Sequence, residues 1–209
     1  MKLEVVNIAG EKTGRQVELN DAIFGVEPNN HAVYLTVKQY LANQRQGTHK
    51  SKERSEITGS TRKLHRQKGT GGSRKGDIKN PLYHGGGTIF GPRPRNYSFK
   101  LNKKLKELAR RSALSHKAAN NGIVVVEDFT FEKPATSKFS GMLKDLGVTG
   151  TRTLLVMPSS DRNVVLSGRN IQRTEVIQAA DLNTYTVMKA NRLIITEKAI
   201  QAINEQVEK

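Results

Sequence analysis

The chain has 209 residues, a hydrophobic content of 35% and a formal net charge of +16 at pH 7. This length suffices for one good-sized core, but the low hydrophobic content indicates that part of the chain lies outside it. The sequence contains no cysteine, which excludes disulfides and thiolate metal sites, and no segment is long and apolar enough for a signal peptide or a membrane span. We therefore expect a cytoplasmic protein with no membrane partner.

The first 43 residues predict two short strands and one long helix. Leu3–Ile8 and Gln16–Leu19 have strand character around a glycine-containing turn at 10–14. Pro28-Asn29-Asn30 opens a helix that runs to about Asn43. Its expected apolar stripe consists of Val33, Val37, Tyr40 and Leu41.

Regular periodicity stops at Gln44. The segment 44–100, which we call the arm, holds 10 of the 18 glycines, three of the 6 prolines and 14 basic residues. Between Gln44 and Thr88 the sizeable apolar residues are few: Ile57, Leu64, Ile78, Leu82 and Tyr83. The arm buries too little to offset the entropy of ordering it, so we predict an extended functional loop.

Regular structure is predicted again from Asn102, a cap for a helix that ends near Asn120. Its expected inner side is Leu101, Leu105, Leu108 and Ala109, and its outer side is Lys103, Lys104, Lys106, Arg110, Arg111 and Lys117. Four apolar runs typical of strands buried on both faces follow, at 123–126, 153–157, 174–177 and 193–195. Helical patterns lie at about 136–146, 160–168, 184–190 and 197–207.

Strands that alternate with helices imply crossover connections. We therefore predict an α/β fold with a three-layer open sheet, mostly parallel, with helices on both faces. A single globular domain, formed by 1–43 and 101–209, is interrupted by the arm. The pattern does not fix the strand order.

The positive charge is concentrated in the middle of the chain. Residues 1–43 carry 4 basic and 5 acidic side chains, residues 44–120 carry 20 and 4, and residues 121–209 carry 11 and 10. So local an excess repels itself unless a polyanion neutralises it. Glycine lets such a chain enter narrow gaps, while Lys and Arg bind phosphates, as recognition of folded RNA requires.

Several motifs resemble parts of enzyme sites, but each lacks the neighbouring elements or partner residues that such a site requires. The glycines around Gly69 and Gly71 follow no strand and open no helix, and the third glycine of a dinucleotide fingerprint would fall at Arg74. His84-Gly85-Gly86-Gly87 resembles an oxyanion-hole tetrad, but the chain has no nucleophile elbow. The five histidines lack metal-ligand spacing. Glu127 and Asp128 follow a buried strand and are the best carboxylate pair, although an acidic loop start explains them better.

We accordingly predict no catalytic residue, no metal and no cofactor. Two alternatives stay open: an α/β enzyme with a basic insertion, and a free regulatory RNA-binding protein. Four aromatic residues near the arm could stack on bases. Tyr83 and Tyr97 are candidates for this, whereas Phe90 and Phe99 flank the return to the core and are expected to anchor the base of the arm.

A set of motifs makes a resemblance specific. They are Arg45-Gln46-Gly47-Thr48, Thr58-Gly59-Ser60, Arg66-Gln67-Lys68-Gly69-Thr70-Gly71, Gly86-Gly87 with Phe90, Arg93-Pro94 and Lys103-Lys104. In order and spacing they resemble the bacterial large-subunit ribosomal protein L4 family over nearly the whole chain. In that family the globular domain lies on the outer side of the subunit. The loop passes through ribosomal RNA, and its tip helps form the constriction of the nascent-peptide exit tunnel.

The resemblance implies a structural role in subunit assembly and translation. The implied partners are large-subunit ribosomal RNA, neighbouring ribosomal proteins and, near the tip, the nascent peptide, with no homo-oligomer. The implied RNA-binding residues are Arg45, Gln46, Thr48, Lys50, Lys52, Arg54, Arg62, Lys63, Arg66, Gln67, Lys68, Gly69, Thr70, Gly71, Arg74, Lys75, Lys79, Tyr83, Arg93, Arg95, Lys103, Lys104, Arg110 and Arg111. The implied tunnel-lining tip spans 65–74 and includes His65, Arg66, Lys68, Gly69, Thr70 and Gly72.

The tip departs from the family pattern at two places. Leu64-His65 stands where the family has Pro-Trp, and Gly72-Ser73-Arg74 stands where it has Arg-Ala-Arg. An aromatic ring and a cation of the family are therefore missing near the tip, so its local contacts need not follow the family.

Overall fold

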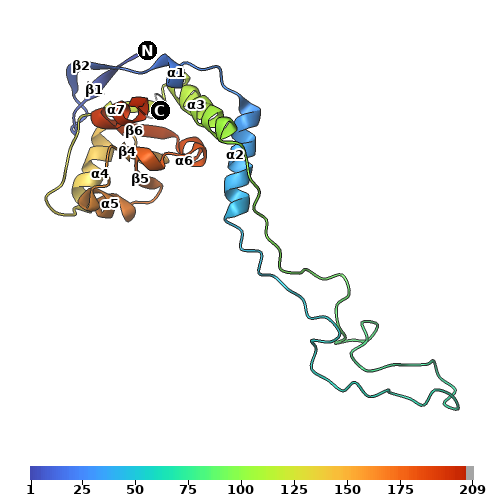
Figure 1. Ribbon diagram of the computed structural model, residues 1–209. Coiled ribbons are helices and arrows are strands. Elements are labelled where there is room, and N and C mark those ends of the chain that lie inside the picture. Colours follow the sequence, from blue (N-terminus) through green and yellow to red (C-terminus); the bar gives the residue numbers. More distant parts are fainter. Residues whose placement is uncertain (206–209) are drawn as a thin grey trace. The chain divides into compact units, whose positions relative to one another are not determined.

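The computed structural model describes residues 1–205 and separates into two units. One unit consists of Met1–Leu41 and the chain from Lys100 onward, and it holds the sheet and most of the helices. The other, Ala42–Phe99, contains nearly all of the arm. Figure 1 shows the arm as a trace with neither helix nor strand beyond the end of the N-terminal long helix. No helix within residues 1–205 is long and apolar enough to cross a bilayer.

The globular unit is built on one six-stranded sheet within the described residues. The strands are β1 (Lys2–Val6), β2 (Lys12–Glu18), β3 (Ile123–Val126), β4 (Thr153–Met157), β5 (Thr174–Gln178) and β6 (Arg192–Thr196). Their order is β2-β1-β3-β6-β4-β5, and only β2 is antiparallel to its neighbour. The predicted mostly parallel α/β fold is confirmed.

Helices connect the strands, as the sequence predicts. They are α1 (Asp21–Phe24), α2 (Asn30–Asn43), α3 (Lys103–Ala119), α4 (Thr136–Asp145), α5 (Arg162–Arg169), η1 (Ala179–Asp181), α6 (Thr184–Lys189) and α7 (Glu197–Glu205). The two shortest, α1 and η1, are not predicted because one turn has no periodicity to detect. The predicted end of the last helix, at about 207, lies outside the described residues.

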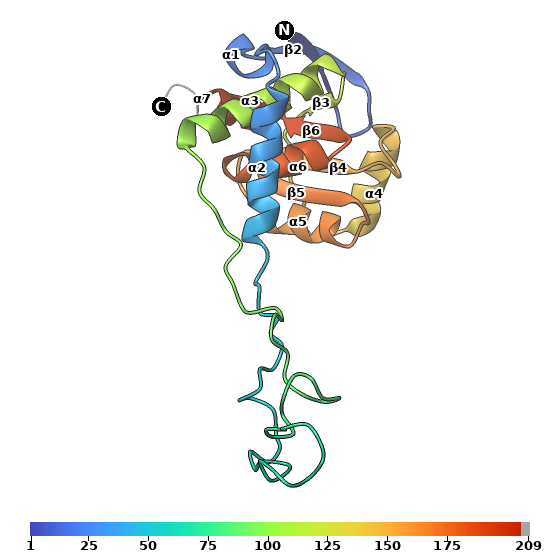
Figure 2. The same ribbon diagram turned by 90° about the vertical axis from the view of Figure 1, so that its right-hand side faces the viewer.

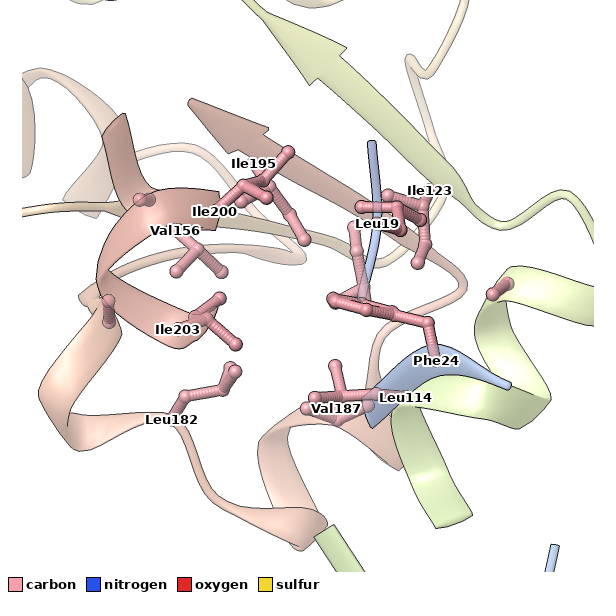
Figure 3. Close-up of a cluster of buried hydrophobic side chains, with 14 of the residues drawn as sticks. Leu19, Phe24, Leu114, Ile123, Val156, Leu182, Val187, Ile195, Ile200 and Ile203 are labelled. Carbon is pink, nitrogen blue, oxygen red and sulfur yellow. The ribbon is translucent and has the colours of Figure 1, made fainter. Parts of the chain in front are cut away.

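Alternation along the central strands places apolar side chains on both faces of the sheet. In β4, Leu154 and Val156 join one cluster, which α1, α3, α6 and α7 cover, while Leu155 and Met157 join the other, which α4 and α5 cover. Figure 3 shows the first cluster, where Val156 and Ile195 from the sheet point toward Ile200 and Ile203 of α7. These two clusters make the unit a three-layer structure.

Helix α3 fixes the segment that leads into α2. It packs against α1 and α6, near which it lies in Figure 2. Its buried Ser115 Oγ donates to the Ile23 carbonyl at 3.0 Å and accepts from Val26 N at 3.1 Å. Ser112 Oγ accepts from Asn29 N at 3.1 Å, and Asn29 Oδ1 in turn accepts from Ala32 N in the first turn of α2. Two buried hydroxyls thus hold the start of α2 on α3.

Several expected details of the helices are wrong. Within α2 the buried residues are Ala32 and Gln39, whereas Val33, Val37 and Tyr40 are half-buried and Leu41 is exposed. The packed side of α3 is made mostly of small residues, with Leu114 as its one large buried side chain, and Leu108 is exposed. Small side chains let α3 approach its neighbours closely, and this preference has no signal in apolar periodicity alone.

Two expected details of the strands and one of the basic face also need correction. Strand β2 begins at Lys12, because Val6 pairs with Lys12 and Glu4 with Gln16, so Gly14 lies in a bulge at a φ of 76° and not in a turn. Strand β5 is half-buried throughout, because it is the edge strand. Lys117 is half-buried and donates to the Ala190 carbonyl at 2.5 Å, and its burial lowers the pKa of its ammonium group.

We predict that Ser115→Ala destabilises the globular unit by about 1–3 kcal/mol, since it leaves the Val26 N–H and the Ile23 carbonyl without their partner. Ser137→Ala, on the exposed side of α4, serves as the control and should change the free energy of unfolding by less than about 0.5 kcal/mol. Denaturant unfolding of both variants checks this. Equal stabilities would show that the two buried bonds do not hold α2 in place.

Candidate nucleic-acid interface

The arm is a long hairpin whose two sides meet at widely spaced backbone hydrogen bonds. From its base outward these run from Arg95 N to Gly47 O (3.2 Å), Ser51 N to Pro92 O (3.1 Å), Thr88 N to Lys52 O (3.0 Å) and Leu64 N to Gly76 O (3.0 Å). No strand forms along this path, so most backbone N–H and C=O groups of the arm are available to an external partner. Such a backbone can donate to phosphate and sugar oxygens.

The base of the arm is held by one aromatic ring between two cations. The Arg45 guanidinium carbon lies 3.8 Å from the centroid of the Tyr97 ring, and that of Arg95 lies 4.4 Å from it. The Tyr97 hydroxyl lies 3.2 Å from His49 Nε2. We call Arg45, Tyr97 and Arg95 the neck stack. Cation–π attraction lets two arginines sit close together here despite their like charge.

Gly47 makes the neck stack possible. Its φ is 66°, in the left-handed region that favours glycine. A Cβ at this position would overlap the Arg95 carbonyl oxygen and lie 3.0 Å from the Tyr97 ring. The two sides of the arm can therefore approach this closely only with glycine at position 47.

A single buried carboxylate organises the middle of the arm. Asp77 is only 7% exposed, and its Oδ1 lies 3.0 Å from Arg54 Nη2 in an ion pair without the alignment of a hydrogen bond. Two open cavities flank this pair. One, of about 400 Å³, is lined by Arg54, Thr61, Lys63, Gln67, Arg74, Lys75, Gly76 and Asp77. The other, of about 440 Å³, is lined by Glu53, Arg54, Ser55, Thr61, Asp77 and Lys79.

Each of the three acidic residues of the arm forms an ion pair with a cation of the arm. Glu56 pairs with Lys50, Asp77 with Arg54, and Glu53 with Arg93 at 2.5 Å. The bond from Lys50 and the backbone bond from Glu53 both lower the pKa of the Glu56 carboxyl group. Since 44–100 contains 14 basic and three acidic residues, eleven cations have no acidic partner in the described chain.

The predicted tip is exposed and its cations are mostly free. Arg66, Lys68 and Arg74 make no hydrogen bond, ion pair or ring contact within residues 1–205, while Lys63 donates to Gln67. Lys75 Nζ lies 5.9 Å from the centroid of the half-buried Tyr83 ring. The tip is thus the part of the arm with the fewest internal contacts.

The remaining candidate residues on α3 belong to the globular unit. Lys103 and Lys104 are exposed, whereas Arg110 and Arg111 are half-buried. Gln46, Thr48, Lys52, Arg62 and Thr70 are exposed in the arm, as is the backbone of Gly69, Gly71 and Gly72. His65 and Lys79 complete the set, the first exposed and the second half-buried.

Phe90 is not the anchor that its position suggests. Its side chain is 99% exposed, and Leu82 is 88% exposed. Tyr97 is the aromatic residue that holds the base instead. No sequence signal joins Tyr97 to Arg45, because the contact connects positions 52 residues apart in a segment without periodicity.

The carboxylates considered for catalysis are committed to structural contacts. Glu127 pairs with Arg15, and Asp128 accepts from Lys198 N at 3.3 Å and lies 3.7 Å from Lys198 Nζ. Within residues 1–205 no group of three or more His, Asp or Glu side chains is arranged to hold a metal ion.

Comparison with known proteins decides the family. Residues 17–206 match the sequence profile of the Ribosomal protein L4/L1 family. The chain belongs to this family.

Relatives named large ribosomal subunit protein uL4 align over nearly their whole length. The protein of Parabacteroides distasonis is 60% identical over 205 residues, 98% of either chain, and that of Porphyromonas gingivalis is 60% identical over the same length and share. The protein of Flavobacterium johnsoniae is 54% identical over 209 residues, 100% of either chain. As a member of the L4/L1 family the chain is a ribosomal protein of the cytoplasm and not an enzyme, as the sequence predicts.

We predict that Gly47→Ala opens the neck stack. With both guanidinium groups over the Tyr97 ring, its ring current should shift the side-chain proton resonances of Arg45 and Arg95 upfield in the wild-type protein. A Cβ at position 47 should remove most of that shift by displacing the Arg95 carbonyl. NMR spectra of the full chain measure it. Gly72→Ala is the matched control, since a Cβ there meets nothing within 4 Å. Unchanged arginine shifts in Gly47→Ala would contradict the role of Gly47.

Proposed function

We propose that this member of the L4/L1 family is a structural component of the large ribosomal subunit whose arm binds ribosomal RNA. The observation that carries the proposal is the set of eleven arm cations without an acidic partner. The name of the relatives, large ribosomal subunit protein uL4, supports the choice of subunit.

Ribosomal RNA fits both the charge and the shape of the arm. Each phosphate that a Lys or Arg neutralises releases counterions, which supplies much of the affinity. The sparse backbone pairing leaves donors for phosphate and sugar, while the 400 Å³ cavity beside Asp77 offers four cations within one concavity, Arg54, Lys63, Arg74 and Lys75. An acidic globular protein could be bound by a compact basic surface and would not require an extended arm.

The structure suggests a division of labour among the proposed RNA-binding residues. Lys50, Arg54 and Arg93 have internal acidic partners, and Arg45 and Arg95 hold Tyr97, so these five shape the arm as well as contact RNA. The proposed primary phosphate ligands are drawn from the other cations without an acidic partner: Lys52, Arg62, Lys63, Arg66, Lys68, Arg74, Lys75, Lys79, Lys103 and Lys104. Gln46, Thr48, Gln67, Thr70 and the neighbouring glycine backbone add uncharged contacts.

We also propose that the tip, residues 65–74, forms part of the wall of the exit tunnel and meets the nascent peptide there. The family resemblance suggests this location. The exposed side chains of Arg66 and Lys68, free of internal contacts, are compatible with lining a channel.

Finally, we propose that residues 1–43 and 101–209 fold as a domain without the arm, since both hydrophobic clusters lie within them. A variant in which a short linker joins Asn43 to Asn96 should unfold cooperatively. In RNA-binding titrations the full chain should show a log–log salt slope of about −0.7 per phosphate contacted, and the variant a much shallower slope with far lower affinity. A full chain whose binding ignores salt would contradict the RNA-binding function, and a variant without cooperative unfolding would contradict the domain proposal.

We predict that Lys68→Glu leaves subunit assembly mostly intact, because the lost contact, worth about 1–3 kcal/mol, is one among many. It should instead alter macrolide sensitivity or stalling by nascent peptides, which depend on the tunnel wall. Lys133→Glu, an exposed cation of the globular unit, is the control for both assays. Lys68→Glu ribosomes that assemble normally and match the wild type in both assays would contradict the tunnel location.

The second candidate function is that of a free regulatory RNA-binding protein. The excess positive charge of the arm fits this function equally well. Sedimentation separates the two. A subunit component stays with large subunits through a high-salt wash, whereas a free regulator appears in the supernatant.

A further inference from the structure

Arginines stand at the amino-terminal ends of three neighbouring strands. Arg192 is the first residue of β6, and Arg152 and Arg173 immediately precede β4 and β5. The three strands are adjacent and parallel, and Thr153 pairs with Arg192 on one side and Thr174 on the other. The three side chains therefore start from the same end of the sheet, where these strands begin, across two strand spacings of about 4.8 Å each. We call Arg152, Arg173 and Arg192 the arginine edge.

The opposite edge of the same strands carries acids. Glu197 follows β6 directly, and Asp161 and Asp181 lie in the segments that follow β4 and β5. Arg162 at the start of α5 and Lys198 in α7 also lie at this end of the strands, so the acids there have basic neighbours, whereas three arginines stand where the strands begin.

The arginine edge keeps most of its donors free. Arg152 has no side-chain partner in the described chain. Arg173 Nη1 donates to the Gly150 carbonyl at 3.0 Å, and Arg192 Nη1 donates to the Asn121 carbonyl. Each guanidinium has five N–H donors, so at least four remain on each arginine. The acid nearest in the chain, Glu175, is bound to Lys189.

A cleft opens beside these arginines. It has a volume of about 240 Å³ and lies between α6 and the starts of β4 and β5. Arg152 and Arg173 contribute cations to its lining, Lys189 lines it in an ion pair with Glu175, which lines it as well, and Thr174 and Thr186 contribute hydroxyl groups. Cations and hydroxyls around one concavity are what phosphate oxygens need.

Arg173 also has an unusual backbone. Its φ is 62°, and among the described residues only Asn121, with a φ of 50°, is another non-glycine at positive φ. Asn121 is the residue whose carbonyl accepts from Arg192. Glycine adopts this backbone conformation more readily, so an arginine at position 173 carries a conformational cost.

We propose that the arginine edge and its cleft form a second RNA-binding surface, on the globular unit, that takes phosphates of the RNA backbone. This proposal rests on the proposed function, because its ligand is the same ribosomal RNA that the arm is proposed to bind. None of these arginines belongs to the basic segment 44–120, so this surface adds contacts that the charge distribution along the sequence does not reveal.

The test compares Arg152→Glu with Arg162→Glu in the full chain. Both residues are exposed, and they stand at opposite ends of β4, so the second variant makes the same charge change at the other edge. The probe is large-subunit ribosomal RNA, with hydroxyl-radical footprinting and salt titration as readouts. Arg152→Glu should remove a discrete patch of protection and make the log–log salt slope less negative by about 0.7 per phosphate lost. Arg162→Glu should do neither.

Arg173→Gly separates binding from folding. Glycine relieves the backbone at a φ of 62°, so thermal stability should stay equal or rise while the same footprint patch weakens. A variant that loses stability and binding together would assign Arg173 a structural role and count against the proposal.

The outcomes separate this inference from the proposed function. If the wild-type chain protects no RNA, the function itself fails. If the wild type protects RNA and the Arg152→Glu and Arg162→Glu variants give identical footprints and slopes, only the second surface is overturned. Loss of a cross-link to a neighbouring protein in Arg152→Glu subunits, with RNA footprints unchanged, would also overturn it in favour of an acidic protein partner.

Discussion

Uncompensated positive charge in the arm is the constraint on which the rest of the structure depends. The chain supplies three acids to this segment, and Lys50, Arg54 and Arg93 use all of them. The other cations are held within reach of one another by a hairpin with few backbone bonds. At physiological salt, like charges closer than about 8 Å repel one another with little screening. A polyanion around the arm would neutralise these charges and so stabilise the conformation of the arm.

Local devices inside the arm reduce this repulsion without removing it. The neck stack lets Arg45 and Arg95 share one ring, and Asp77 draws in Arg54 where the two sides approach in the middle. Both devices shape the arm, and both leave guanidinium donors available. The globular unit complements them with a rigid sheet and with hydroxyls of α3 that hold the start of α2. The chain thus joins a globular unit built on one sheet to an arm with eleven cations that lack an acidic partner within the described residues.

The elements that depend on local periodicity were predictable. The runs at 123–126 and 153–157 became central strands within one residue of the predicted bounds, because buried strands and continuous apolar runs coincide. The strand order was not predictable, because it depends on crossovers that leave no trace in the sequence. The arginine edge followed only from that order, since Arg152, Arg173 and Arg192 lie about 20 residues apart along the chain.

Within the arm, composition predicted a basic extended segment but not its internal contacts. Phe90, expected as an anchor, is exposed, whereas Tyr97 holds the base through two arginines. The ion pair of Asp77 with Arg54 joins positions 23 residues apart in a stretch without periodicity. Contacts of this kind depend on how the two sides of a hairpin align, and a glycine-rich sequence without periodicity does not encode that register locally.

Lysine reactivity in assembled large subunits tests the central claim most directly. Mass spectrometry would compare acetylation of each lysine in the free protein and in the subunit. Binding of the arm to ribosomal RNA predicts strong protection of Lys52, Lys63, Lys68, Lys75 and Lys79, with smaller changes at Lys133 and Lys138 of the globular unit. Arm lysines that stay as reactive in the subunit as in the free protein would contradict the account.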